Sequence, residues 1–186
     1  MKNTEIEIKV QTSNAQPLLD FLEQNGQKIG TEHQIDEYFS PAHRNFVEKK
    51  PVKEWLRLRN SDGVCSINYK NWIYNEDGKS NHCDEYESTV GDFENMQKIF
   101  KALDIKSLVT VDKLRTIWKY ENYEISIDTV VQLGDFIEIE YKSEEENMDT
   151  AKIATEMESF LKNLGCTDIE RNYVGYPFLL LFGNNQ

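Results

Sequence analysis

Polar and apolar residues alternate along several short stretches of the chain, with the period of two that is typical of half-buried β-strands. The first stretch runs from Thr4 to Val10, where charged residues occupy alternate positions. The same alternation predicts eight strands, over residues 4–10, 34–39, 54–60, 64–71, 84–90, 110–118, 123–128 and 135–142. Turn residues such as Ser61-Asp62-Gly63 mark the point where one strand returns along the next.

Three other segments place their apolar residues at helical spacing. These predicted helices cover about residues 14–25, 92–103 and 149–164. Asp92 is placed to cap the second helix, while Gly26 and Gly165 follow the first and the third as stop signals. The aromatic tail over residues 172–182 is expected to pack against the rest of the chain.

The predicted elements repeat in their order along the chain. A strand, a helix and three strands are followed by the same series, before the last helix and the tail. Glu5 and Glu7 precede the first helix much as Glu85 and Glu87 precede the second. No low-complexity linker divides the two halves, so we predict a single α+β domain over residues 1–186 with weak internal duplication.

The polar sides of the predicted strands are strongly charged. A charged face on a single strand normally means contact with solvent, and the argument for a site comes from the whole set. If the helices cover the apolar face, the charged faces of a curled sheet point at one another, which predicts a closed barrel with a charged interior. Small barrels are usually filled by apolar side chains. Because unpaired buried charge is costly, this interior requires alternating signs or a ligand.

Both signs of charge are present on these faces. Away from the first strand, the cations suited to binding phosphate are Arg57, Arg59, Lys70, Lys113 and Arg115. The carboxylates are Glu5, Glu7, Glu85, Glu87, Asp128, Glu138 and Glu140. Hard divalent cations prefer oxygen ligands, and Mg²⁺ is often held by carboxylates together with substrate phosphates. The combination predicts a site for a polyphosphate–metal complex.

Composition narrows the possible binding partners and the cellular compartment of the protein. The chain has 33 Asp and Glu against 21 Lys and Arg, a net charge of −12 that argues against general nucleic-acid binding. Its three cysteines, Cys65, Cys83 and Cys166, lack metal-ligand spacing and favour a reducing, cytoplasmic compartment. We expect no signal peptide, because the N-terminal residues Met1 to Glu5 contain no apolar core, and no membrane span, because the longest apolar run, Tyr176 to Phe182, is too short.

The charged motifs resemble those of a known family. Glu5-x-Glu7-x-Lys9 is similar to the signature of the CYTH superfamily, the triphosphate tunnel metalloenzymes. The other motifs follow in family order: Asp36-x-Tyr38-Phe39, Trp55-Leu56-Arg57-Leu58-Arg59, Tyr69-Lys70, Glu85-x-Glu87, Lys113-x-Arg115, Asp128, and Leu133-Gly134-Asp135-Phe136-Ile137-Glu138-Ile139-Glu140. They span nearly the whole chain, and the stretch from Asp112 to Glu140 is most similar to the class IV adenylyl cyclase branch.

The resemblance implies an eight-stranded antiparallel tunnel, with helices outside, that binds a triphosphate with Mg²⁺ or Mn²⁺. The implied metal ligands are Glu5, Glu7, Glu138 and Glu140. The implied triphosphate ligands are Lys9, Arg57, Arg59, Lys70, Lys113 and Arg115. Catalytic roles would fall to Lys9, Asp128 and Glu138, with Glu85 and Glu87 as supporting residues on the opposing wall. The substrate would be ATP or a polyphosphate, and the cyclase branch implies a homodimer.

Three functions stay open at this point. The first is a class IV-like adenylyl cyclase that converts ATP to cyclic AMP and pyrophosphate. The second is a triphosphatase that hydrolyses inorganic triphosphate, a nucleoside triphosphate or thiamine triphosphate. The third is a non-catalytic sensor of polyphosphate or nucleotide, which the full carboxylate set disfavours because binding alone needs the cations more than the metal ligands. One fold can host all three, so the choice depends on the site.

Overall fold

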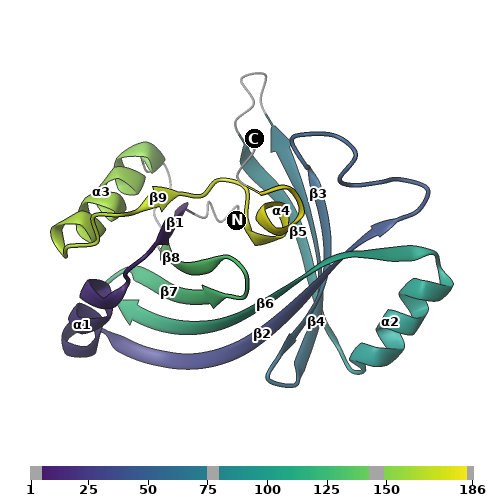
Figure 1. Cartoon of the computed structure of the whole chain (residues 1–186), viewed down its shortest axis with the longest axis horizontal. Coiled ribbons are helices and arrows are strands. Elements are labelled where there is room, and N and C mark those ends of the chain that lie inside the picture. Colours follow the sequence, from purple (N-terminus) through teal and green to yellow (C-terminus); the bar gives the residue numbers. More distant parts are fainter. Residues whose placement is uncertain (1–5, 75–79, 143–148, 184–186) are drawn as a thin grey trace. The chain divides into compact units, whose positions relative to one another are not determined.

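Figure 1 shows the computed structural model of the chain, which describes residues 6–74, 80–142 and 149–183. The described strands are β1 (Ile6–Thr12), β2 (Gln27–Pro41), β3 (Glu54–Ser61), β4 (Val64–Tyr74), β5 (Ser80–Val90), β6 (Ile105–Tyr120), β7 (Tyr123–Val130), β8 (Gly134–Tyr141) and β9 (Glu170–Arg171). The described helices are α1 (Gln16–Asn25), α2 (Phe93–Ala102), α3 (Thr150–Asn163) and α4 (Tyr176–Phe182). The α+β class predicted from the sequence is therefore confirmed.

The strands form one antiparallel sheet in the order β5-β4-β3-β2-β6-β7-β8-β1-β9. Within the described residues, β5 and β9 are the two edge strands, and hydrogen bonds do not close the sheet. The closed eight-stranded barrel is thus not confirmed. Strands β6, β7 and β8 form a meander, and β1, the first strand of the chain, pairs with β8 and extends it.

The chain divides into two compact units, each described here by itself. Unit 1 contains residues 1–32 and 113–179, and unit 2 contains residues 33–112 and 180–186. Strands β2 and β6 contribute residues to both units. The single duplicated domain stays a prediction.

In unit 1, the apolar face of the sheet forms the core together with α1 and α3. The sheet contributes alternate residues, and each helix contributes its apolar stripe. The fully buried members are Ile8, Val10, Leu18, Leu22, Ile125, Ile137, Ile139, Met157 and Leu161. This arrangement confirms, within the unit, that helices cover the apolar side of the strands and leave the charged side opposite.

In unit 2, α2 packs on the apolar face of its strands. Phe100 of α2 meets Phe39 of β2 edge-to-face, with ring centroids 4.9 Å apart, and Leu58 of β3 is fully buried beside them. The predicted cap is confirmed, because the Asp92 carboxylate accepts a hydrogen bond from the Asn95 N–H at 2.9 Å.

Several elements differ from the prediction. Strand β2 begins at Gln27 rather than near residue 34, and Ile29 in this early part is 57% exposed. None of residues 27–33 is buried, so this part of β2 has no core-facing pattern that the sequence could show. It belongs to a strand because β2 is hydrogen-bonded to its neighbours in the sheet. Leu114, an apolar residue of the predicted strand over residues 110–118, is 50% exposed. The aromatic tail forms the short helix α4, whose first four residues are buried. No helix among the described residues is long and apolar enough to cross a membrane.

Candidate functional site

Six residues gather on the charged face of unit 1, and we call them the Asp128 cluster. They are Lys9, Lys113, Arg115, Asp128, Glu138 and Tyr176. Register brings them together, because Lys9 lies directly opposite Glu138 on β1 and β8, and Arg115 lies opposite Asp128 on β6 and β7. Tyr176 reaches the same face from the start of α4.

Asp128 is the centre of this cluster and its side chain is 0% exposed. Arg115 donates to both carboxylate oxygens, from Nε at 2.7 Å and from Nη2 at 2.6 Å, which is the bidentate geometry that guanidinium groups favour. The Lys113 Nζ lies 3.6 Å away, and the Tyr176 hydroxyl donates at 2.7 Å. Burial alone would raise the pKa of Asp128, but Arg115 and Lys113 more than offset burial, so the pKa is lowered.

Glu138 is the second anion of the Asp128 cluster. It pairs with Lys9 at 2.8 Å and with Arg115 at 3.2 Å. Burial works against its charge, yet these two cations hold the pKa of Glu138 well below its usual value. Burial would likewise lower the pKa of Lys9, but the charges of Glu138 and Glu7 raise it overall. Both partners therefore stay ionised at neutral pH.

A row of carboxylates crosses three strands beside this cluster. Glu7 of β1 lies opposite Glu140 of β8, and Glu140 lies opposite Glu124 of β7. Like charges directly opposite one another destabilise a sheet unless a cation neutralises them. The Lys142 Nζ approaches Glu140 to 2.5 Å, whereas the Glu7 side chain is exposed. A positive ion would relieve the repulsion in this row.

The predicted metal ligands can be compared with this row. Glu5 lies outside the described residues, and Glu138 is held by Lys9 and Arg115. Glu7 and Glu140 offer the hard oxygen donors that Mg²⁺ and Mn²⁺ prefer, so the donor chemistry fits a divalent cation. In the part of the chain that the structure describes, no group of three His, Cys, Asp or Glu residues is already arranged to hold a metal.

Unit 2 carries a second charged group, the Asp36 cluster. It consists of Asp36, Arg57, Arg59, Asn68, Lys70, Glu85 and Glu87. Arg59 forms the same two-pronged contact with buried Asp36, from Nε and from Nη2, each at 2.6 Å. The carboxylates hold Arg57 more loosely, at 3.8 Å from Asp36 and 3.8 Å from Glu87, and its side chain also hydrogen-bonds Tyr38. Its side chain is 13% exposed, and its buried Nε has no hydrogen-bond partner among the described residues.

The remaining pair of the Asp36 cluster joins β4 to β5. Lys70 lies opposite Glu85 and contacts it at 3.0 Å, while the Asn68 amide donates to Glu85 at 2.6 Å. Burial would raise the pKa of Glu85, but Lys70 and Asn68 lower it. Glu87, the other predicted supporting residue, accepts from the Ser66 hydroxyl at 3.0 Å.

The two clusters repeat one arrangement. In each unit an arginine donates two hydrogen bonds to a buried aspartate directly opposite it on the next strand. The cation two residues before that arginine lies at a similar distance from the aspartate in both units, 3.6 Å for Lys113 and 3.8 Å for Arg57. A lysine–glutamate pair across two neighbouring strands completes each cluster. The weak duplication of the sequence itself stays a prediction.

The structure brings together most of the predicted site residues within their own units. Lys9, Lys113, Arg115, Asp128 and Glu138 meet in one cluster. Arg57, Arg59, Lys70, Glu85 and Glu87 meet in the other. Residues absent from the predicted set are Asp36, Asn68, Glu124 and Tyr176. Asp36 and Glu124 have signals in the sequence, since each is a charged residue at an alternating position, whereas Tyr176 lies in the tail and has none.

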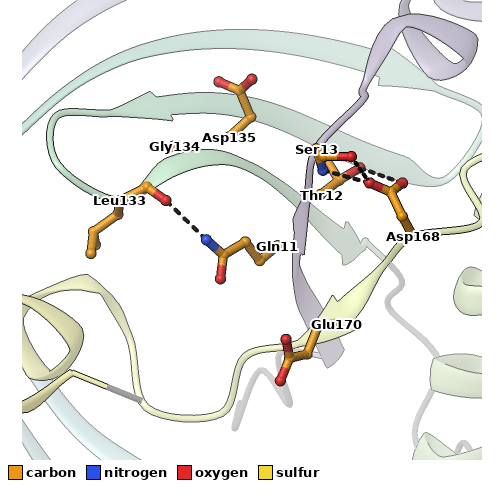
Figure 2. Close-up of a pocket in the computed structure, with 8 residues that line it drawn as sticks. All are labelled: Gln11, Thr12, Ser13, Leu133, Gly134, Asp135, Asp168 and Glu170. Carbon is orange, nitrogen blue, oxygen red and sulfur yellow. Dashed lines mark hydrogen bonds between the residues drawn. The ribbon is translucent and has the colours of Figure 1, made fainter.

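A separate pocket of about 380 Å³ opens in unit 1 at the ends of β1 and β8. Figure 2 shows Gln11 donating to the Leu133 carbonyl at 2.9 Å on one side, and Thr12 and the Ser13 N–H donating to Asp168 at 3.1 and 2.7 Å on the other. Asp135 and Glu170 also line the pocket. Its acidic lining is unsuited to phosphate and separates it in character from the Asp128 cluster.

Comparison with known proteins identifies the family. The profile of the CYTH domain matches residues 3–173 of the sequence. The chain belongs to the CYTH domain family. CYTH proteins are in general enzymes, cyclases or triphosphatases, that bind triphosphate substrates and use divalent metals. A protein of Methanocaldococcus jannaschii named "putative adenylate cyclase" is 36% identical over 180 residues, covering 96% of this chain and 98% of its own.

Solved structures share this CYTH fold. A protein of Pyrococcus horikoshii superposes with a TM-score of 0.70 at 26% identity, covering 91% of this chain and 94% of its own. A protein of Hippeastrum described as a "putative adenylyl cyclase" superposes with a TM-score of 0.68 at 19% identity, covering 94% and 93%. At that lower identity the likeness concerns the fold alone.

Proposed function

We propose that this CYTH protein is a metal-dependent enzyme that cyclises ATP to cyclic AMP and pyrophosphate. The observation that carries the proposal is the Asp128 cluster, where three cations from two strands converge beside a row of carboxylates. Cations alone suit a phosphate, and carboxylates alone suit a metal. Their combination on one face of unit 1 suits a triphosphate that carries a metal. The name of the archaeal relative at 36% identity supports cyclisation.

Lys9 and Lys113 are the phosphate ligands of unit 1 in this proposal, and Arg57 and Lys70 those of unit 2. Lys9 stays protonated because Glu138 and Glu7 raise its pKa, so it acts by neutralising developing charge and not as a base. Arg115 and Arg59 are fixed by their aspartates and set the spacing of the cations beside them. The role of these residues is positioning and charge neutralisation, as in phosphoryl transfer generally.

Asp128 is a positioning residue in this proposal. Both of its oxygens already accept hydrogen bonds from Arg115 or Tyr176, and its lowered pKa keeps it ionised. Its lowered pKa makes it a weak base, so we do not assign it the proton of the substrate hydroxyl. In cyclisation, the 3′-hydroxyl oxygen bonds to the α-phosphorus, the bond to the bridging oxygen breaks, pyrophosphate leaves and the hydroxyl proton passes to water.

Glu7 and Glu140 would hold the divalent cation, with Glu5 and Glu138 as the further ligands that the resemblance implies. The cation, when bound, supplies charge neutralisation on the phosphates and lowers the pKa of the attacking hydroxyl. Replacing Glu7 or Glu140 by glutamine keeps the side-chain volume and removes one negative charge. Turnover should then fall, and higher metal concentrations should restore part of it.

A second candidate is triphosphate hydrolysis, in which water attacks the terminal phosphorus. The solved Hippeastrum structure favours it, since that protein bears a cyclase name and its description reports a dominant triphosphatase activity. The cations and carboxylates required are the same, so the nucleophile, either the 3′-hydroxyl or a water molecule, distinguishes the two reactions. The non-catalytic sensor is the third outcome.

The deciding experiment follows the phosphorus products by NMR. The protein is incubated with ATP, and separately with inorganic triphosphate, in Mg²⁺ and in Mn²⁺. Cyclic AMP with pyrophosphate supports the proposal, and orthophosphate from either substrate supports the hydrolase. Binding of triphosphate without any product supports the sensor. Glu7→Gln should lower product formation in either enzyme, while Lys152→Gln, a charge change on a 72% exposed side chain of α3, serves as the control.

A further inference from the structure

One aromatic member of the Asp128 cluster lies beyond the part of the chain that matches the family. The match ends at residue 173, and Tyr176 follows as the first residue of α4. Its side chain is buried. The hydroxyl donates to Asp128 at 2.7 Å, and the ring packs edge-to-face on Phe136 of β8 with centroids 4.8 Å apart. Two contacts at opposite ends of the side chain therefore fix the orientation of this ring.

The fixed ring faces two ammonium groups. The Lys9 Nζ lies 4.9 Å from the ring centroid, and the Lys113 Nζ lies 5.1 Å from it. Both distances fall within the roughly 6 Å over which the negative face of an aromatic ring attracts a cation. Two ammonium groups that share one ring repel each other, and the ring offsets part of that repulsion without contributing a formal charge.

We propose that Tyr176 is a positioning residue that holds Lys9 and Lys113 at a fixed spacing for a phosphate group. The inference rests on the proposed function, because it takes phosphate to be the ligand of these lysines. A carboxylate partner competes with phosphate for the donors of an ammonium group. An aromatic ring forms no ion pair with that group and faces only the N–H groups turned toward it, so the ring stays in place when the anion binds.

Two substitutions separate the roles of the hydroxyl and the ring. Tyr176→Phe keeps the ring and removes the hydrogen bond to Asp128, whereas Tyr176→Leu removes both. Binding of inorganic triphosphate is measured by calorimetry in the presence of Mg²⁺. We expect the Phe variant to bind within about threefold of wild type and the Leu variant to bind about tenfold more weakly, since two cation–ring contacts are lost.

A steady-state measurement distinguishes positioning from general loss of structure. With the substrate that the protein turns over, KM of the Leu variant should rise about tenfold while kcat stays within about twofold, which is the pattern of lost uniform binding. Leu179→Ala is the matched control, because Leu179 is a buried residue of the same helix that makes no contact with either lysine among the described interactions. It should lower stability and leave the affinity unchanged.

Three results would overturn the proposal: a Leu variant that binds like wild type, a Phe variant that loses as much as the Leu variant, or an equal loss in Leu179→Ala. If Tyr176→Leu does not fold, NMR of the lysine ε-methylene groups provides the test in wild type and Tyr176→Phe. The ring should shift the Lys9 and Lys113 signals upfield, and triphosphate should move them further; unshifted signals also overturn the proposal. Shifted lysines in a wild-type protein that fails to bind triphosphate would instead refute the proposed function.

Discussion

Replacing Asp128 by asparagine should destabilise the protein strongly at neutral pH. The substitution keeps the shape of the side chain and removes a charge that is 0% exposed and that contacts Arg115 and Lys113. Breaking a buried ion pair from one side typically costs about 3–5 kcal/mol. Because the asparagine oxygen can still accept from Arg115, we expect about 3 kcal/mol, a large part of the roughly 5–15 kcal/mol that stabilises a typical domain.

The pH dependence of this loss can be worked out from the direction of the pKa shift. The pKa of Asp128 is lower in the folded protein than its unfolded value of about 3.9. Its contribution is therefore complete above about pH 4 and is lost as the pH falls through the lower, folded value. The difference between wild type and Asp128→Asn should be constant from pH 6 to pH 8 and should narrow progressively below about pH 4.

Urea unfolding at several pH values measures this difference. The midpoint should fall with little change in the slope, since the surface exposed on unfolding is the same. Asp36→Asn is the matched variant in unit 2, because Asp36 is forked by Arg59 in the same geometry. The reasoning is wrong if Asp128→Asn costs less than about 1 kcal/mol at pH 7, or if its cost does not change between pH 7 and pH 3.

Three further predictions follow from the same contacts. Arg59→Gln should lower stability more than Arg57→Gln, and Arg57→Gln should weaken triphosphate binding more, since both ion pairs of Arg57 described here span 3.8 Å whereas Arg59 lies 2.6 Å from Asp36; equal effects on both measurements would contradict this division. Phe100→Ala should cost about 3–5 kcal/mol in urea unfolding and leave KM unchanged, because Phe100 lies in the core under α2; a raised KM with intact stability would contradict it. Removing divalent metal with a chelator should abolish turnover, and Glu140→Gln should raise the Mn²⁺ concentration required for half-maximal rate; turnover in the presence of chelator would refute the metal assignment.

Much of the fold is encoded in local alternation. The strand around Ile8 and the helix capped by Asp92 lie where the sequence predicts them, because each has one buried face and a clear boundary residue. The early part of β2 and helix α4 escape prediction. Residues such as Ile29 in β2 are exposed on a strand without a core-facing pattern, and α4 is a short apolar run whose period cannot be distinguished from that of a strand.

The candidate site likewise contains residues that the sequence predicts and partners that it does not. Lys113 and Arg115 are recognisable from sequence because they are charged at alternating positions of a strand. Their partners depend on register, which the alternation alone does not determine. The pairing of Arg115 with Asp128 and of Arg59 with Asp36 follows from which residues lie directly opposite across two strands. Tyr176 joins the site by tertiary packing, and a tail aromatic carries no local sign of that role.

The ion pairs within the Asp128 cluster also affect which anions the protein binds. Lys9 and Arg115 each have a carboxylate partner at 3.2 Å or closer, so an incoming phosphate must displace existing contacts. A single orthophosphate replaces one or two of these contacts and gains little. A chain of linked phosphates replaces several at once while losing its translational freedom only once. The free protein should therefore bind orthophosphate weakly, and its affinity for an anion should rise with the number of linked phosphates.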